Sequence, residues 1–239
     1  IGTVLRPRRL RVRELSAQFE QVCLNAIQHG KHTILIGAEI DASVGPILKT
    51  YADRAGVVFS YTDGDEPGVA MNLYRLVDSM GYRPVLMGQL KGFLDRYRNP
   101  DTQLELATRL GQNPAVLACF ADGSKLPIEA AIMGTASGFV PKVRGMQGHP
   151  CGHVNDMLKS FTADDFASEG YVEYALGAAP HTGAFVICHN DHPEKRKLMA
   201  YLKMGEALLW SALPIVPGEV VVELGCAPGG AAPAGLPRT

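Results

Sequence analysis

The stretch HTILIGAEIDASVGPILKTYADRAGVVFSY, residues 32–61, decides the fold class. It opens with a continuous apolar run over residues 32–38, which is typical of a parallel strand buried on both faces. Residues 44–56 have helical spacing, with Pro46 near the predicted first turn and Gly56 just beyond the end. Residues 57–61 predict the next strand. A strand, a helix and a strand in this order predict a βαβ unit.

The same alternation continues on both sides of this unit. A helix is predicted over residues 16–30, another over 69–81, and a buried strand over 83–90. We therefore expect one parallel sheet through residue 90 and an α/β fold overall. Downstream, the pattern predicts a helix at 102–111, a strand at 115–120, a helix at 127–138, strands at 170–177 and 183–189, and a helix at 193–204.

The composition excludes several classes of protein. Hydrophobic residues make up 46% and charged residues 20% of the chain, which is enough to bury a core and excludes a disordered protein. The net charge of −1 gives no positive field for nucleic acid or an anionic membrane, and no apolar run is long enough to span a bilayer. The five cysteines form no CxxC pair, and no signal peptide is visible, so we expect a cytoplasmic protein. The basic run at 6–13 predicts a solvated leader.

Charged side chains gather where three predicted strands end. In α/β sheets, ligands bind beyond the carboxyl ends of the strands, so these groups are candidates for a common site. Glu39 and Asp41 follow the predicted strand at 32–37. Lys91, Asp95, Arg96 and Arg98 follow the strand at 83–90, and Asp122 and Lys125 follow the strand at 115–120. Solvated loop charges are the alternative interpretation. Three groups at successive strand ends favour a site for an anionic substrate, with a lysine at its centre.

Lys91 is the central candidate. It leaves a strand end between two glycines, where partial desolvation suits an amine to proton transfer or to polarising a carbonyl. Arg96 and Arg98, with the backbone around Asn99, form a predicted clamp for a carboxylate or phosphate. Asp122 and Lys125 are either an acid–amine pair or capping residues of the next helix.

Histidines and cysteines offer a rival site. Imidazole and thiolate are good zinc ligands, but the spacing here matches no zinc pattern. We therefore predict loop histidines and no metal at these six residues, which are His149, Cys151, His153, Cys188, His189 and His192.

Several long segments resemble one enzyme group. AIQHGKHTILIGAEIDASVGPILKTYADRAGVVFSYTDGDEPG (26–68) resembles the distal half of the nucleotide-binding domain in homoserine-dehydrogenase-like oxidoreductases. This group includes the deoxyxylulose-phosphate reductoisomerase-like enzymes. Segments similar to its central domain are GQLKGFLDRYRNPDTQ (88–103), FADGSK (120–125), VRGMQGH (143–149) and YALGAAPHTGAFVICHNDHPEKRKLMAYLKMGE (174–206).

The resemblance implies a fold and a domain division. Its fold is a partial Rossmann-type parallel sheet followed by a mixed α/β substrate domain. The corresponding ranges are 14–84 for the distal Rossmann half, 85–205 for the substrate domain and 206–239 for an atypical tail. No GxGxxG precedes residue 23, so the glycine-rich half is predicted to be lacking, and Gly37 and Gln89 stand where the group has asparagines.

The resemblance also implies an NAD(P)-dependent oxidoreductase that moves hydride to or from a small anionic hydroxy or keto substrate, homoserine-like or phosphorylated sugar-like. Lys91, Asp122 and Lys125 would be catalytic, and Gly37, Ala38 and Glu39 would bind the cofactor, NADP or NAD. The substrate would contact Arg96, Arg98, Asn99 and Arg144. The reductoisomerase-like members also imply a divalent metal chelated by the substrate, for which Glu39 and Asp122 are candidate carboxylates. A truncated sheet with an exposed edge strand would favour a homo-oligomer.

Residues 206–230, EALLWSALPIVPGEVVVELGCAPGG, carry a second resemblance, to the first motif of FtsJ-like S-adenosylmethionine-dependent methyltransferases. Only nine residues follow the motif, so we expect no working methyltransferase site. The alternatives to the oxidoreductase are therefore a non-catalytic module of the same fold that binds small anions, and a methyltransferase remnant.

Overall fold

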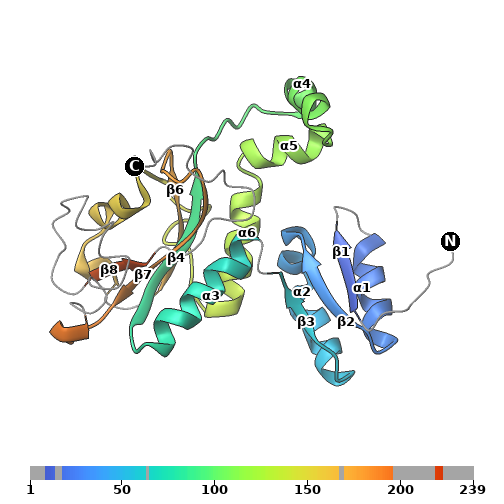
Figure 1. Ribbon diagram of the computed structural model, residues 1–239, viewed down its shortest axis with the longest axis horizontal. Helices are drawn as coiled ribbons and strands as arrows, with labels where there is room; N and C mark the ends of the chain where they lie inside the picture. The colour runs from blue at the N-terminus through green and yellow to red at the C-terminus, as the bar shows by residue number, and fades with distance from the viewer. Residues whose placement is uncertain (1–8, 14–17, 63–64, 167–169, 196–218, 223–239) are drawn as a thin grey trace, which may run out of the picture.

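The computed structural model describes residues 9–13, 18–62, 65–166, 170–195 and 219–222. It confirms the α/β class, with a small parallel sheet followed by a larger mixed sheet (Figure 1). In chain order the elements are β1 (Arg9–Arg13), α1 (Gln18–Gln28), β2 (His32–Ile36), α2 (Ala38–Arg54), β3 (Phe59–Tyr61), α3 (Glu66–Ser79), β4 (Arg83–Lys91), α4 (Pro100–Leu110), α5 (Pro114–Ala121), α6 (Lys125–Ser137), β5 (His149–Pro150), the 3₁₀ helices η1 (Val154–Ser160) and η2 (Ala163–Phe166), β6 (Tyr171–Leu176), β7 (Thr182–His189) and β8 (Glu219–Val222).

The small sheet has the order β1-β2-β3, and its strands are all parallel. Its core is built from α1, α2, β2 and β3, with Cys23, Ile27, Leu35 and Leu48 buried. The predicted solvated leader is wrong for residues 9–13, because these residues pair with β2 from Arg9↔His32 to Arg13↔Ile36. Backbone groups make that ladder, and the alternation of arginine with Leu10 and Val12 has the two-residue period of a strand.

The larger sheet has the order β5-β6-β4-β7-β8, and β4 is parallel to β6 but antiparallel to β7. The expectation that β4 would extend the first parallel sheet is therefore wrong. Its apolar sequence correctly indicated burial on both faces, but burial does not specify which strands lie beside it. Partners of β4 come from residues about 80 or more positions downstream, beyond the reach of local patterns.

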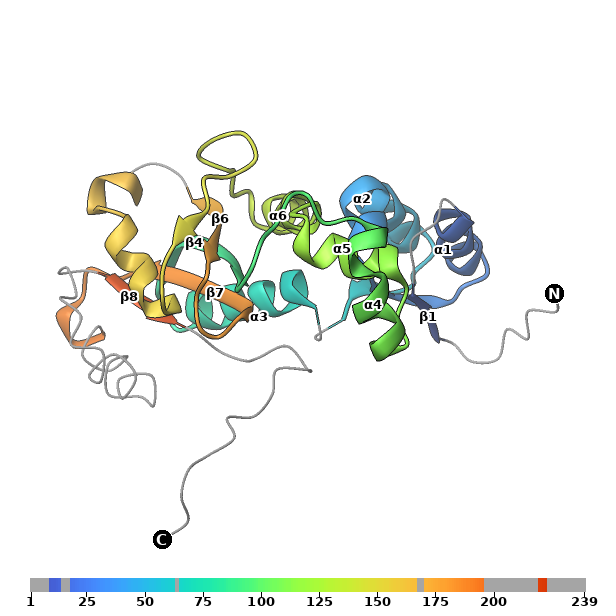
Figure 2. The same cartoon turned by 90° about the horizontal axis from the view of Figure 1, so that it is seen from above.

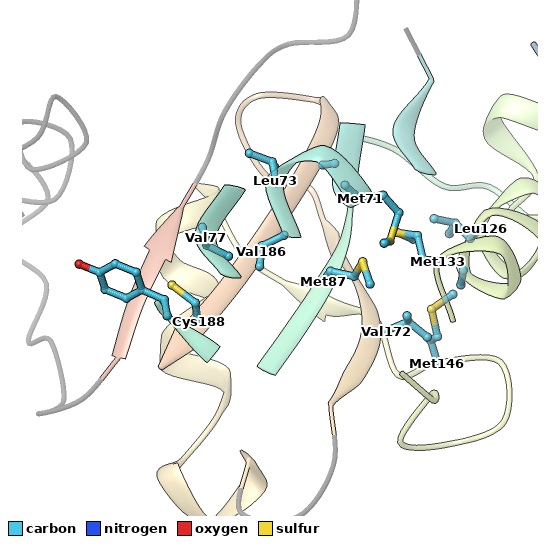
Figure 3. Packing of buried hydrophobic residues seen from close by; sticks show 14 residues of the cluster. Met71, Leu73, Val77, Met87, Leu126, Met133, Met146, Val172, Val186 and Cys188 are labelled. Carbon is cyan, nitrogen blue, oxygen red and sulfur yellow. The ribbon is translucent and has the colours of Figure 1, made fainter. Parts of the chain in front are cut away.

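Helices α3 and α6 cover one face of the larger sheet, and η1 and η2 cover the other. Helix α3 belongs to this layer although it precedes the predicted boundary at residue 84. Thioethers fill much of the core beneath it, where Met71, Met87, Met133 and Met146 come from four different segments (Figure 3). Helix α6 also packs against α2, so it lies between the two sheets (Figures 1 and 2).

Residues 115–120 form helix α5, so the strand predicted there is wrong. A short apolar run has no period that separates a strand from a helix, and the local start signals decide the matter. Asn113 is the N-cap and accepts a hydrogen bond from Ala115 N at 2.9 Å, and Pro114 stands in the first turn. Helices α4 and α5 pack on each other and project beyond both sheets (Figure 1).

The structure describes only part of the segments for which predictions were made near the carboxyl terminus. Residues 193–195 are helical, and the rest of the predicted helix at 193–204 lies outside the described residues. Strand β8 pairs antiparallel with β7, and the remainder of the methyltransferase-like motif also lies outside them. Within the described part of the chain, no helix combines the length and the apolarity that crossing a membrane requires.

Candidate active site

The end of strand β4 directs Lys91 toward helix α6. Alternate residues of the strand share a face. Met87 lies in the core with α6 residues Leu126 and Met133 (Figure 3), and Gln89 Nε2 donates to Leu126 O at 3.1 Å. Lys91, two residues further on, therefore points to the same side, and the residue is only 7% exposed.

The turn from β3 into α3 supplies two carboxylates. Asp65 is the N-cap of α3, where its side chain accepts from Glu66 N at 3.2 Å. Tyr61, the last residue of β3, donates its hydroxyl to Asp65 Oδ2 at 2.8 Å. Acidic residues are favourable at a helix N-terminus because they face the positive end of the helix dipole. Local capping chemistry therefore fixes Asp65 and Glu66 at this turn.

The first two turns of α6 add an amine and a third carboxylate. Lys125 Nζ lies 3.4 Å from Glu129 Oε1, one turn along the helix. Glu129 is 1% exposed, and its other oxygen, Oε2, is buried without a hydrogen-bond partner among the described residues. An ionised carboxylate held in this way is costly unless a further partner is present.

These residues meet in one place. One carboxylate oxygen each from Asp65, Glu66 and Glu129 lie within 4.8 Å of one another, and we call these three residues the carboxylate cluster. Burial raises the pKa values of Glu66 and Glu129, and the positive charge of Lys91 opposes this rise, so this amine also lies near the cluster. Two lysines and three carboxylates thus share one small volume.

Burial and mutual repulsion perturb the acids of the cluster. Burial, together with the negative charge of Glu66, raises the pKa of Glu129 to about 7. Burial and a side-chain hydrogen bond with Asp65 raise the pKa of Glu66. Burial acts in the same direction on Asp65, but hydrogen bonds from Glu66 and Tyr61 and the charge of Lys125 outweigh it, so the pKa of Asp65 is lowered. With a pKa of about 7, Glu129 is therefore partly protonated near neutral pH.

We expect Glu129 to make the protein less stable as the pH rises from 5 to 8 in the presence of EDTA. Its folded-state pKa of about 7 lies above its ordinary value of 4.5, so the folded protein holds a proton that the unfolded chain loses between these values. The contribution to the free energy of unfolding is present below pH 4.5 and lost through pH 7, and it is on the order of 3 kcal/mol. Urea unfolding of wild type and Glu129→Gln at pH 5, 6, 7 and 8 measures it.

The exposed, remote Glu105→Gln on α4 is the matched control for that series and should keep the wild-type pH dependence. Equal pH dependence in wild type and Glu129→Gln would show that Glu129 is ionised throughout and would contradict the perturbed pKa.

Three of the predicted site residues come together here. Lys91 and Lys125 lie beside the carboxylate cluster, and Glu39 is near enough to act on Lys125. Burial lowers the pKa of Lys125, but the negative charges of Glu129, Asp65 and Glu39 outweigh it, and the pKa is raised. Lys125 is therefore a fixed cation of the site.

The predicted anion clamp is placed on the loop that leads into α4. Arg98 Nε pairs with Asp95 at 3.0 Å, and the Arg96 guanidinium lies 4.9 Å from the centre of the Tyr97 ring. Asn99 is the N-cap of α4 and accepts from Thr102 N.

One further predicted catalytic residue and one further predicted substrate-binding residue lie at turns. Asp122 is the C-cap of α5, not the residue after a strand, and its Oδ1 accepts from Ser124 N at 2.8 Å. Arg144 is exposed in a turn. No hydrogen bond or ion pair seen among the described residues joins Arg96, Arg98, Asn99, Asp122 or Arg144 to Lys91 or to the carboxylate cluster.

The predicted cofactor-binding residues lie where β2 passes into α2. Gly37 has a φ of +148°, a conformation that favours glycine, and it is the N-cap of α2 without a side-chain capping bond. Helix α2 begins at Ala38, six residues before the predicted start, so Glu39 and Asp41 lie in its first turn instead of a loop. The predicted start relied on Pro46, which the helix tolerates in its interior.

The rival histidine and cysteine residues are dispersed. His153 caps η1, His189 Nε2 lies 2.7 Å from Asp191 Oδ1, and Cys188 is a core residue whose pKa burial raises to about 12. Of the residues the structure describes, the carboxylate cluster forms the one group of three or more potential metal ligands.

Another buried acid, Glu173, has a structural role on the opposite face of the sheet. Its carboxylate accepts hydrogen bonds from Gln147 N and Gly148 N, each at 2.9 Å. Its Oε2 lies 3.7 Å from His149 Nε2. These bonds fix the turn that precedes β5. Glu173 therefore has backbone donors that Glu129 lacks.

A cavity of about 340 Å³ lies between α2, β3, α3 and α6. Tyr61 lines it, and the same side chain donates to Asp65 of the carboxylate cluster. Asp41, whose pKa is raised by burial, lines it from the other side. The cluster is thus connected through Tyr61 to a space large enough for a small ligand.

Sequence reasoning missed Asp65, Glu66 and Glu129. Glu129 carried a usable signal, because Leu126, Glu129, Ala130 and Met133 recur at helical spacing and all four are buried. An acid within an apolar stripe indicates a buried charge with a partner. Asp65 and Glu66 had only the pattern of a helix start, which is common at surface helices.

A family model for the oxidoreductase DRL catalytic domain matches residues 64–213, more than half of the 239-residue chain. The chain belongs to this oxidoreductase family. The matched oxidoreductase DRL catalytic domain begins directly before α3 and contains Lys91, Lys125 and the whole carboxylate cluster. The prediction of an oxidoreductase is confirmed at this level, and the narrower relation to homoserine dehydrogenases and reductoisomerases stays a prediction. No curated protein matches the sequence.

Proposed function

We propose that the protein is an NAD(P)-dependent oxidoreductase that moves hydride to or from a small anionic hydroxy or keto substrate at Lys91. The observation that carries this proposal is the position of Lys91, buried at the end of β4 beside the carboxylate cluster and within the oxidoreductase DRL catalytic domain. Homoserine-like and phosphorylated sugar-like compounds are the substrates that suit a site with two lysines.

The passage from β2 into α2 fits the nicotinamide end of the cofactor. A glycine in a conformation that side chains disfavour lets a ligand approach the backbone closely, and Gly37 provides it. The first amides of α2 have no side-chain cap at Gly37, so they are available to a polar ligand group. Gly37, Ala38 and Glu39 would hold the cofactor, which supplies hydride exchange when bound.

Lys91 would stabilise the oxygen that gains or loses negative charge at the reacting carbon. Lys125 is paired with Glu129, whereas Lys91 Nζ has no ion-pair partner within 4.0 Å in the part of the chain that the structure describes. An ammonium group that faces a developing alkoxide in a site without water stabilises the negative charge strongly, and it can exchange a proton with that oxygen. Lys125 would keep the surrounding acids in place.

The anionic end of the substrate would contact residues that the sequence predicted for that purpose. Arg96, Arg98, Asn99 and Arg144 stay proposals for this role, as does Asp122 for proton transfer. The present partners of Arg98, Asn99 and Asp122 lie in their own turns, so binding would require these three side chains to exchange those contacts. Self-association also stays a prediction.

The proposal is tested by titrating the purified protein with NADPH and following the fluorescence of the reduced nicotinamide. We expect saturable enhancement at micromolar concentrations, and a Kd at least tenfold weaker in Gly37→Ala. Gly56→Ala is the matched control, because Gly56 also has a positive φ (64°) but terminates α2 at its far end. Gly56→Ala should also lose stability but keep the wild-type Kd.

An absence of enhancement up to millimolar NADPH or NADH would overturn the proposal for this chain. If the protein then still bound small phosphorylated or carboxylated compounds, it would be a non-catalytic module that binds anions. Equal weakening of NADPH binding in both glycine variants would instead show that the cofactor does not bind at the turn between β2 and α2.

A further inference from the structure

We propose that the cavity between α2, β3, α3 and α6 binds a free α-amino acid with an apolar side chain. This is a second ligand site, apart from the centre around Lys91. Neither Lys91, Lys125 nor the carboxylate cluster lines the cavity, and Tyr61 stands between the two places, because its side chain lines the cavity while its hydroxyl donates to Asp65. The inference does not rest on the proposed function, and its test needs no hydride transfer.

One wall of the cavity is the open edge of the small sheet, at strand β3. Residues 59–62 line the cavity consecutively, and β3 pairs only with β2 in the part of the chain that the structure describes. This edge of the sheet faces α6 (Figure 1). Val58 O and Thr62 N bond to β2, so the alternation along a strand turns the backbone groups of Phe59 and Tyr61 toward the open edge. The edge therefore offers backbone donors and acceptors to a polar ligand.

The wall formed by α2 presents an acid. Asp41 lines the cavity half-buried, and its carboxylate forms no hydrogen bond or ion pair with another described residue. Gly45 makes this position possible, because a Cβ built there would overlap Asp41 Oδ1. Burial raises the pKa of Asp41, as expected for a carboxylate whose charge has no compensating partner among the described residues. The ammonium group of a ligand would supply that partner.

The wall formed by α3 presents a cation. Arg75 lines the cavity and forms no ion pair within 4.0 Å with a described residue, whereas Lys49, the other cation of the lining, is paired with Asp53 at 2.5 Å. A guanidinium group binds a carboxylate through two parallel hydrogen bonds, so Arg75 suits the carboxylate of a ligand. An unpaired acid on α2 and an unpaired guanidinium on α3 together match the two charges of a zwitterion.

The apolar part of the lining favours an apolar side chain on the ligand. Phe59, Met71 and Ile132 are buried, line the cavity and come from β3, α3 and α6 in turn. A polar ligand side chain placed against them would lose its hydrogen bonds to water without replacement. The volume of about 340 Å³ lies at the lower end for ligand pockets and suits a compound of amino-acid size. Leucine therefore represents the class.

The test is isothermal titration calorimetry of the full chain with L-leucine and with three analogues that each lack one feature. We expect one leucine per chain with a Kd of about 1 mM or tighter. Isocaproate lacks the ammonium group, isopentylamine lacks the carboxylate and glycine lacks the side chain, so each should bind at least roughly tenfold more weakly than leucine. Equal affinity for leucine and any one of the three would overturn the proposed ligand class.

Substitutions connect each feature of the ligand to a residue. Asp41→Asn should weaken leucine binding roughly tenfold and leave isocaproate binding unchanged, and Arg75→Gln should weaken leucine binding and leave isopentylamine binding unchanged. Gly45→Ala is a second variant for the acid, because its methyl group displaces the Asp41 carboxylate and keeps its charge. Asp78→Asn and Arg54→Gln make the same chemical changes at exposed helix positions outside the cavity and should bind leucine like wild type.

The outcomes separate this inference from the proposed function, and circular dichroism verifies that each variant is folded. Absence of leucine binding up to its solubility limit, or wild-type affinity in all three cavity variants, would overturn the amino-acid site and leave the proposed function untouched. Loss of leucine binding in saturating NADPH would assign the cavity to the cofactor and would also overturn the second site. Leucine binding by a chain that does not bind NADPH would support the second site and overturn the proposed function alone.

Discussion

Replacing Lys91 with methionine is expected to reduce the rate of hydride transfer by roughly 100- to 10,000-fold. Methionine has a similar length and fits a position that is 7% exposed, so the change removes the charge with little change in packing. The assay is NADPH oxidation with keto substrates drawn from homoserine-like and phosphorylated sugar-like compounds. The loss should fall mainly on kcat, because the charge acts on the oxygen that becomes negative in the transition state.

Lys159→Met is the matched control for that measurement. Lys159 lies in η1 with its side chain 55% exposed, and its partner Asp156 is three residues away. Its replacement should leave kcat within about twofold, since exposed ion pairs contribute little. A kcat of Lys91→Met within tenfold of the wild-type value would show that Lys91 does not take part in hydride transfer.

Replacing Gly88 with alanine is expected to lower the free energy of unfolding by about 3 kcal/mol or more. Gly88 lies in the middle of β4, and an added Cβ would collide with the backbone carbonyl of Glu173 on β6. A backbone atom in a central strand cannot move aside without breaking the ladder between β4 and β6. Urea unfolding monitored by circular dichroism measures the loss.

Gly152→Ala controls for the removal of a glycine. No heavy atom lies within 4 Å of a Cβ built at Gly152, and its φ is not in the left-handed region, so stability should change by less than about 0.5 kcal/mol. A loss below about 1 kcal/mol in Gly88→Ala would show that β4 and β6 can separate locally. The same separation would displace Lys91, which pairs with Leu176 at the end of this ladder.

Within the candidate site, the sequence predicted the position of Lys91. Its position after an apolar strand placed it at the carboxyl end of β4, and that required only the local pattern. The carboxylate cluster could not be predicted in the same way. Asp65 and Glu129 are 64 positions apart, and their meeting depends on the packing of α3 against α6.

Local chemistry by itself determined the α/β class and most helices of this protein. Capping residues and prolines act on the backbone within a few positions, and they set the start of α4 at Asn99 and its end at Gly111. Apolar periodicity likewise located β2, β4, β6 and β7. These signals depend on neighbours in the chain, so the sequence contains them in full.

Only the tertiary structure decided the partners of each element. Burial of β4 is visible in its residues, but its place between β6 and β7 follows from long-range pairing. The basic segment at 9–13 became a strand because β2 offered it an open edge. The ionisation of Glu129 was decided in the same way, because desolvation and the charge of Glu66 exist only after α3 and α6 have packed together.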